Sequence, residues 1–184
     1  GRVTDAAGRP VLLQEHIPGL PHQANWMFDA YLDGSSSCRF AATGRKTGQY
    51  PAYSGMATAA VSERNDEVSS TALALLGHLG YAGPVDVDLR FDTRDGRYKV
   101  IDVNPRVGGT FRLFVAPNGV DVIRAMYLDL TGQGVPSSTV PDGRRWVVET
   151  HVMASAVAYR RDGWTSAGWW LRSLAGTDEG ALFG

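Results

Sequence analysis

Cysteine and long apolar runs are the scarcest features of this sequence of 184 residues. The single cysteine, Cys38, excludes an internal disulfide and a zinc site built from several cysteines. The sequence has no stretch of about 20 apolar residues, and nothing in it resembles a signal peptide. We therefore expect no membrane partner and a cytoplasmic location.

An excess of charge of one sign is missing as well. The 18 Lys and Arg residues nearly balance the 19 Asp and Glu residues, for a net charge of −1, and no long block of either sign marks a surface for nucleic acid. Hydrophobic residues make up 43% and charged residues 20%, which argues against disorder, collagen-like repeats and coiled coil. The expected partners are small molecules, and the chain can bury roughly 70% of its unfolded surface.

The N-terminal part of the chain predicts strands. The apolar run at residues 11–15 predicts a buried strand that ends at the Ile-Pro-Gly turn of residues 17–19. Alternating side chains at residues 26–32 predict a second strand, and the Asp-Gly pair that follows predicts a hairpin turn into a strand at residues 38–43.

Residues 44–55 lack a clear period. They contain three glycines, one proline and the cations Arg45 and Lys46. We expect an exposed loop there, and loops of this length are often functional.

Two helices are predicted further along. The first begins at Asn65, which can cap a helix, and ends at Gly80. The second covers residues 121–130 and ends at Gly132. Residues 131–144, rich in Gly, Pro and Ser, are expected to form a linker.

The linker suggests a division of the chain into residues 1–132 and a C-terminal extension, residues 133–184. We expect the extension to pack over the sheet through its aromatic side chains, and the alternative is a contact surface for a partner. It contains four of the five tryptophans, Trp146, Trp164, Trp169 and Trp170.

The most informative pattern is a predicted hairpin. Apolar and polar side chains alternate over residues 85–92 and again over residues 98–106, with Asp95-Gly96 as the turn. The register that gives one clean apolar face gathers three carboxylates and an amide on the other face.

In that register Asp88 lies opposite Asp102, and Asp86 lies opposite Asn104. Like charges at such positions repel each other, and a hard divalent cation such as Mg²⁺ would offset the repulsion. Arg106, which follows directly, suits a phosphoryl group. The alternative is a solvated face whose acids pair with nearby arginines, namely Arg90, Arg97 or Arg112.

Four motifs, in order along the chain, resemble the C-terminal half of the ATP-grasp superfamily, with the carboxylate–amine ligases as the most similar branch. The resemblance extends over about residues 11–132. The family usually has glutamate where this chain has the shorter Asp102. The motifs are Gln14-Glu15-His16-Ile17-Pro18-Gly19, Gly80-Tyr81-Ala82-Gly83, Asp88 and Asp102-Val103-Asn104-Pro105-Arg106.

The resemblance implies an α+β fold, an antiparallel β-sheet with helices packed on one face, and a metal site. Mg²⁺, with Mn²⁺ as an alternative, would be bound by Asp88 and Asp102, and Asn104 would complete the site. Arg106 would contact phosphate or the acyl phosphate.

The resemblance also implies a nucleotide site, in which a hinge binds the adenine of ATP and Ile17 forms its apolar wall. Lys46, or its neighbour Arg45, lies where the family often places a cation near the phosphates, and a solvated loop cation is the alternative. The hinge residues are Gln14, Glu15, His16 and Ile17.

The implied activity is that of an ADP-forming ligase. ATP phosphorylates a substrate carboxylate, and an amine then attacks the acyl phosphate to form an amide. The thirteen residues before Gln14 cannot hold the glycine-rich loop and lysine of the family's N-terminal lobe. We expect that lobe in the same or another chain, and little or no activity from these 184 residues alone.

Three alternatives stay open. Two of them concern the function, the first being a non-catalytic binding module that uses the tryptophan-rich extension, and one concerns assembly, namely a homodimer. The second functional alternative is a metal-dependent glycosyltransferase, because Asp86-Val87-Asp88 matches the short Asp-x-Asp pattern of those enzymes.

Overall fold

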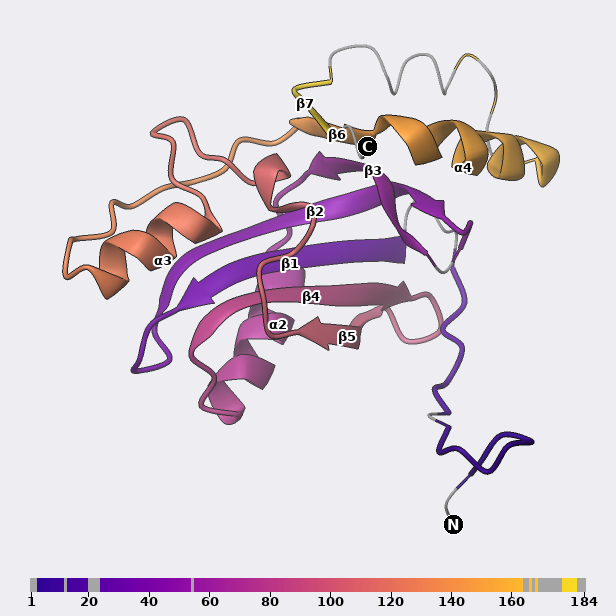
Figure 1. Ribbon diagram of the computed structural model, residues 1–184, viewed down its shortest axis with the longest axis horizontal. Helices are drawn as coiled ribbons and strands as arrows, with labels where there is room; N and C mark the ends of the chain where they lie inside the picture. The colour runs from indigo at the N-terminus through magenta and orange to yellow at the C-terminus, as the bar shows by residue number, and fades with distance from the viewer. Residues whose placement is uncertain are drawn as a thin grey trace.

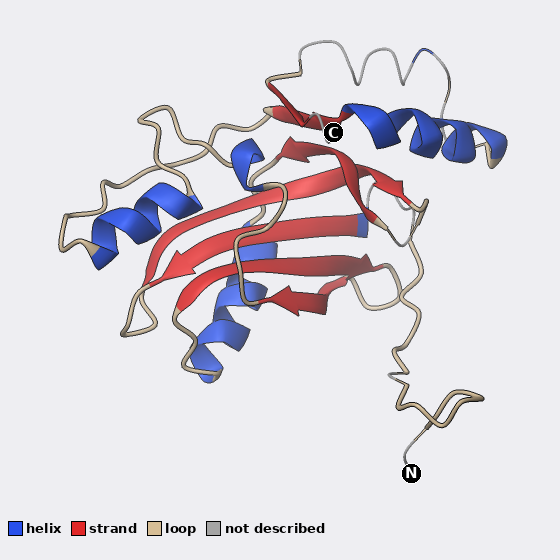
Figure 2. Cartoon of the chain, viewed as in Figure 1, coloured by secondary structure: helices blue, strands red, loops and turns tan. Residues whose placement is uncertain are grey.

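The computed structural model describes residues 3–11, 13–19, 24–53, 55–163, 166, 168 and 177–181. The strands are β1 (Asn25–Leu32), β2 (Cys38–Tyr50), β3 (Met56–Ser62), β4 (Gly83–Asp92), β5 (Arg97–Asn104), β6 (Arg145–Val148) and β7 (Glu179–Ala181). The helices are α2 (Asp66–His78), the 3-10 helix η1 (Phe111–Leu113), α3 (Val122–Leu130) and α4 (Glu149–Arg161), and Figure 2 colours them apart from the strands. The strands form one seven-stranded sheet in the order β5-β4-β1-β2-β3-β6-β7 (Figure 1). Neighbouring strands are antiparallel, except β6 and β7, which run parallel.

β1 lies inside the sheet and is buried on both sides, since all eight of its residues are buried. On one side Trp26 and Phe28 pack against α2, and on the other Met27 and Tyr31 pack with η1 and α3. Figure 1 shows α2 crossing behind the sheet. The expected α+β fold with an antiparallel sheet is confirmed. The helices, however, cover both faces rather than one, because a strand that is apolar on both sides must be covered on both.

Helix α2 begins where the sequence predicts. The side chain of Asn65 accepts hydrogen bonds from the backbone N–H groups of Glu67 and Val68, which satisfies two otherwise unpaired donors of the first turn. The helix buries Val68, Ala72 and Leu76 against the sheet. The predicted second helix is α3, whose N-cap is Asp121.

The expected exposed loop at residues 44–55 is wrong, because β2 continues to Tyr50 and pairs with β3. Gly44 in this stretch allows two layers of the fold to pack closely. A Cβ atom on Gly44 would lie 2.9 Å from the ring of Phe114, so glycine lets the helical layer approach the strand. The loop is confined to the residues between Tyr50 and Met56.

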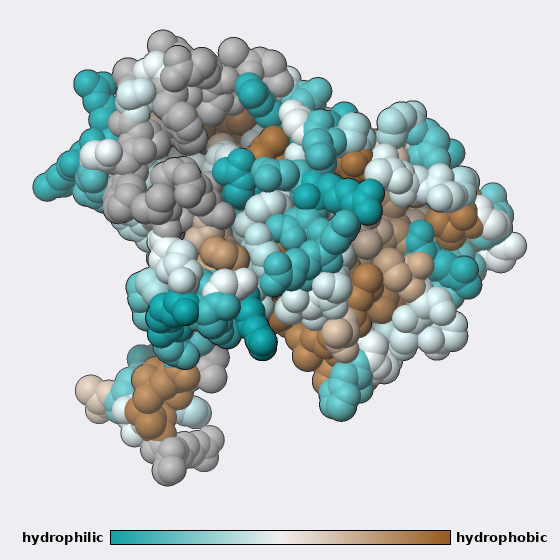
Figure 3. All heavy atoms as spheres, turned by 180° about the vertical axis from the view of Figure 1, so that it is seen from behind, coloured by the Kyte–Doolittle hydropathy of each residue, from teal (hydrophilic) through white to brown (hydrophobic). Residues whose placement is uncertain are grey.

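The expected strand at residues 11–15 is wrong for the part of it that the structure describes. These residues have no regular structure. Gln14 and Glu15 contact the hairpin of β4 and β5 through Ile101 and Arg94, whereas the chain before them extends away from the body of the molecule (Figure 1). Val3, Val11 and Leu13 in this part of the chain are exposed, and the space-filling view from behind shows a protruding lobe with hydrophobic side chains on its surface (Figure 3). No neighbouring strand pairs with it in the described residues, so an apolar run alone does not make a strand here.

The C-terminal part joins the same sheet. Residues 131–144 lack helix and strand as expected, and then β6 pairs with β3. Trp146 is buried in the cluster that includes α3, whereas three of the tryptophans, Trp164, Trp169 and Trp170, lie outside the described residues. The division at residue 132 stays a prediction. In the described parts of the chain, none of the helices is long and apolar enough to cross a membrane.

Candidate functional site

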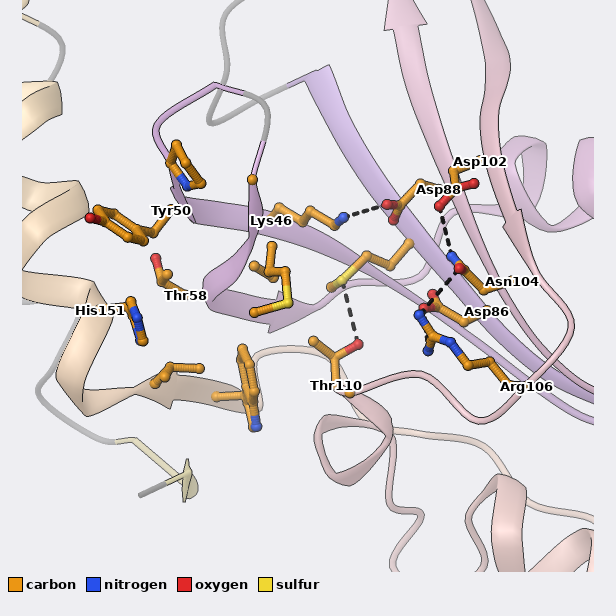
Figure 4. Close-up of a pocket in the computed structure, with 18 residues that line it drawn as sticks. Lys46, Tyr50, Thr58, Asp86, Asp88, Asp102, Asn104, Arg106, Thr110 and His151 are labelled. Atoms are coloured by element: carbon orange, nitrogen blue, oxygen red, sulfur yellow. Dashed lines mark hydrogen bonds and ion pairs between the residues drawn. The ribbon is translucent and has the colours of Figure 1, made fainter. Parts of the chain in front are cut away.

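A cavity of about 680 Å³ lies on the face of the sheet opposite α2. Its acidic end is made by neighbouring residues of β4 and β5 (Figure 4). Asp88 is paired with Asp102, and Asp86 with Asn104, as the sequence predicts. The register shifts just beyond, where Leu89 pairs with Val100 rather than with Ile101.

Lys46 enters this acidic end from β2. Its Nζ atom lies 2.6 Å from Oδ2 of Asp88, and the residue is buried. The strand alternation sends Arg45 elsewhere, where it pairs with Glu63 at 3.0 Å. Of the two neighbouring cations, the structure therefore brings Lys46 to the acids, from a strand instead of the expected loop.

The loop after β5 adds a second cation. The guanidinium of Arg106 donates to Oδ1 of Asn104 at 3.2 Å and lies 4.0 Å from Oδ2 of Asp86. Asn104 in turn donates to Oδ2 of Asp102 at 2.8 Å. The Arg106 side chain is 60% exposed, so its donors can still reach a ligand in the cavity.

Lys46, and not one of the three arginines considered as the alternative, holds Asp88, while Asp102 is exposed. Arg90, one of the arginines considered for that role, donates instead to the backbone carbonyls of Ile17 and Gly19 and to Asn25. It thereby ties the N-terminal segment to β4.

A fourth carboxylate, Asp29 on β1, was not singled out from the sequence. It pairs in register with Asp86 on the neighbouring strand, is fully buried, and neither of its carboxylate oxygens has a hydrogen-bond partner in the described structure. Burial, with the charges of Asp86 and Asp88 in addition, raises the pKa of Asp29 well above its usual value. Burial and the charge of Asp88 raise the pKa of Asp86 to about 6.

The alternation of β1 places Asp29 on the same face as Met27 and Tyr31, and from the sequence it predicted only a strand. Asp29 lies beside Asp86 only because β4 is the neighbour of β1 in the sheet. Local periodicity in the sequence does not predict the order of strands in a sheet. The one signal in the sequence is an acid in a strand whose other residues are almost all apolar.

A second cavity, of about 510 Å³, adjoins the first. All four predicted hinge residues line it, namely Gln14, Glu15, His16 and Ile17. The two cavities share Lys46, Gly55, Asp88 and Asp102. The structure thus brings the hinge to the predicted metal ligands, while Asn104 and Arg106 line the first cavity alone. Asn25 and Gln49, which the sequence did not indicate, also line the second cavity and hydrogen-bond each other.

The donor atoms at the junction of the cavities fit Mg²⁺. Asp88 and Asp102 offer two carboxylates, and Asn104 offers an amide oxygen, which matches an ion that takes one or two protein carboxylates and leaves other positions for water and phosphate. Among the described residues, no group of three or more His, Cys, Asp or Glu side chains could hold a metal ion. A zinc or calcium cage built entirely from such side chains is therefore not formed by that part of the chain.

Comparison with known proteins gives one curated relative and several solved structures, while no family model matches the chain. D-aspartate ligase from Enterococcus faecium (strain Aus0004) is 28% identical over 127 residues, which are 67% of this chain and 30% of that protein. The structure is similar to N5-carboxyaminoimidazole synthetase from Staphylococcus aureus in complex with ADP, with a TM-score of 0.52, 10% identity, and coverage of 69% of this chain and 34% of that one. It is also similar to a biotin carboxylase complex with ATP from Campylobacter jejuni, with a TM-score of 0.52, 16% identity, and coverage of 69% and 29%. The chain spans about a third of the length of these proteins, and the structural likeness shows the fold.

Proposed function

We propose that this chain is the nucleotide- and metal-binding part of a carboxylate–amine ligase. It has the fold of the C-terminal lobe of ATP-grasp enzymes. The observation that carries the proposal is the junction of the two cavities. There the segment expected to bind adenine meets two paired carboxylates and a buried lysine. The named relative is a ligase and one structural neighbour is a synthetase with ADP, which favours a ligase over the glycosyltransferase and over a non-catalytic module.

ATP would occupy the second cavity, with its adenine against residues 14–17 and its phosphates toward the shared wall. Asp88 and Asp102 would hold Mg²⁺, or Mn²⁺ as the alternative, and Asn104 would complete the site with its amide oxygen, while its amide N–H donates to Asp102. The ion supplies neutralisation of phosphate charge when it is bound.

Two cations of the chain act on the reacting groups. Lys46 is held at the shared wall by Asp88, where its ammonium group can reach phosphate oxygens. Arg106 presents an exposed guanidinium in the first cavity, which can donate two hydrogen bonds to the oxygens of an acyl phosphate.

The reaction proceeds in two steps in this proposal. The γ-phosphoryl group of ATP passes to a substrate carboxylate, which leaves ADP and an acyl phosphate. The neutral amine nitrogen then attacks the acyl carbon, the bond between that carbon and the phosphate oxygen breaks, and the phosphate leaves with the proton that the nitrogen loses, so that an amide forms. These side chains would position the reacting groups and neutralise their charge, which is the main requirement of phosphoryl transfer, and no enzyme nucleophile is needed.

The remaining parts of the enzyme are proposed on the same basis. The lobe that covers the phosphates would come from the same or another chain, and the 184 residues alone would show little or no ligase activity. The substrates would be a small carboxylic acid and a small amine. A homodimer and a cytoplasmic location stay predictions.

The test is metal-dependent nucleotide binding by the longest natural form of the protein. Isothermal titration with ADP should give tighter binding with Mg²⁺ than without it, and Asp102→Asn should remove most of this difference. Asp95→Asn removes an acid from the exposed turn of the same hairpin and lines neither cavity, so it serves as the matched control. Equal binding with and without Mg²⁺, or an unaffected Asp102→Asn variant, would contradict the proposal.

A further inference from the structure

We propose that the first cavity binds the amine substrate and selects a primary amine with an uncharged, largely apolar body. The ammonium group would bind Asp86, with Asp29 behind it, and the body would extend toward β6 and α4. This inference rests on the proposed ligase function and adds the chemical class of one of its substrates.

The acidic end of the cavity has the acceptors that an ammonium group needs. The side chain of Asp86 is 15% exposed, and its nearest cation is Arg106 at 4.0 Å, the outer limit of an ion pair. Lys46 is engaged by Asp88 at 2.6 Å. An ammonium group carries three N–H donors, so it can bind Asp86 without displacing either pair.

Asp29 is the independent observation that points to a cation at this place. Its two carboxylate oxygens are buried without a hydrogen-bond partner in the described structure, and such groups are rare in folded proteins. Residues paired in register on antiparallel strands have Cβ atoms about 4.5–5.5 Å apart. A cationic group on Asp86 would therefore lie close enough to stabilise the Asp29 carboxyl group as well.

The backbone of Gly108 covers one side of Asp86. A Cβ atom on Gly108 would lie 2.8 Å from Cγ of Asp86, so the loop between β5 and η1 packs closely against the carboxyl group and a ligand must approach it from the cavity.

The far end of the cavity differs in character from the acidic end. Met56 and Ala57 of β3 and Trp146 and Val148 of β6 give it apolar walls. Beyond them the ring of Tyr50 lies against the ring of His151, with centroids 5.1 Å apart. Figure 4 shows Tyr50 and His151 on the side away from the carboxylates.

The positions of the charged side chains in the first cavity indicate that the body of the amine substrate is uncharged. The lysine and arginine side chains among the described lining residues are Lys46 and Arg106, and both lie at the acidic end. A carboxylate in the body of the amine substrate would therefore meet no lysine or arginine among the described residues of the far end, where His151 is the one basic side chain of the described lining. An apolar body would contact the apolar walls there.

The test is isothermal titration of the full 184-residue chain with three probes, 2-phenylethylamine, 2-phenylethanol and aspartate. The amine should bind about tenfold more tightly than the alcohol of the same shape, because a charged donor contributes more than a neutral one. It should also bind more tightly than aspartate. Equal affinity for amine and alcohol, tighter binding of aspartate, or binding of none of the probes would overturn the inference.

Three variants locate the effect. Asp86→Asn should bring the amine and the alcohol to similar affinities, and Asp95→Asn, at the exposed turn, should leave their ratio unchanged. Met56→Lys adds a cation at the far end on a side chain that is 76% exposed, and it should raise the affinity for aspartate relative to the amine. If Asp86→Asn does not fold by circular dichroism, the probe comparison in the natural chain and Met56→Lys still decide the outcome.

The same titrations separate this inference from the proposed ligase function. Binding of ADP that depends on Mg²⁺, without preference for the amine probe, would overturn the amine site alone. Preference for the amine, without any binding of ADP that depends on Mg²⁺, would overturn the ligase and leave a site for amines.

Discussion

Replacing Asp29 by valine should make the protein more stable, although most core substitutions destabilise. The carboxyl group is fully buried on β1, and both of its oxygens lack a hydrogen-bond partner in the described structure. A buried polar group left unpaired costs about 1–3 kcal/mol. Valine has a similar size, suits a strand, and would lie beside Ala42 and Asp86. We expect Asp29→Val to raise the free energy of unfolding by about 1–3 kcal/mol.

The gain in the free energy of unfolding should depend on pH, and the raised pKa of Asp29 decides whether it grows or shrinks as the pH rises. The pKa of Asp29 in the folded protein lies well above the model-compound value of 3.8 because of burial. A group with a raised folded pKa favours folding most when it is protonated, so its contribution falls as the pH rises above 3.8 toward the folded value. The advantage of Asp29→Val should therefore be smallest in acid and grow toward neutral pH.

Urea unfolding followed by circular dichroism, at several pH values, measures both effects. Asp92 provides the matched control, because it is also a buried strand aspartate but is held by Arg94 at 2.7 Å. Asp92→Val should destabilise the protein. A destabilised Asp29→Val variant, or a gain that is the same at every pH, would refute the assignment of Asp29 as an unpaired buried acid.

Two further predictions concern the core and the phosphate site. Leu89→Ala removes a fully buried side chain from the layer between the sheet and α2, and it should lower the free energy of unfolding in urea by about 2–5 kcal/mol; a loss below about 1 kcal/mol would mean that this layer is loosely packed. Lys46→Met should weaken binding of ADP with Mg²⁺ by about tenfold, whereas Arg45→Met, whose partner is Glu63 outside both cavities, should not; equal effects of the two changes would remove Lys46 from the phosphate site.

The hairpin of β4 and β5 could be predicted from the sequence because residues close together in the chain determine it. Alternation fixes which side chains share a face, and the turn at Asp95-Gly96 fixes which residues face each other. Asp88 and Asp102 therefore pair as expected. The bulge beyond Asp88 escaped prediction, because a single extra residue leaves the alternation of the preceding residues intact.

Features that depend on distant strands could not be predicted. The glycines and proline of residues 44–55 resemble a loop in composition, yet Gly44 is small because Phe114 packs against it. That contact joins two segments far apart in the sequence. Asp29 could not be predicted as part of the site for the same reason, because it belongs to the site only through the pairing of β1 with β4. Residues 14–17 line the same cavity as Asp88 and Asp102, although the strand expected there is absent from the described residues, and their role as an adenine hinge stays a prediction.

The balance of charge in the first cavity links the metal to the nucleotide. Its described lining contains three carboxylates, Asp86, Asp88 and Asp102, against the two cations Lys46 and Arg106, and Asp29 lies buried behind them. The phosphates of a nucleotide would add several negative charges to a cavity whose lining already has one more negative than positive charge. Because like charges at this separation repel each other strongly where water is scarce, the phosphates can approach only together with a cation. In the proposed arrangement, Mg²⁺ on Asp88 and Asp102 would reverse the local excess of negative charge, and the ammonium group would bind Asp86, which the metal does not neutralise. Because metal and amine would then use separate carboxylates, Asp102→Asn should weaken nucleotide binding without abolishing the preference for the amine probe.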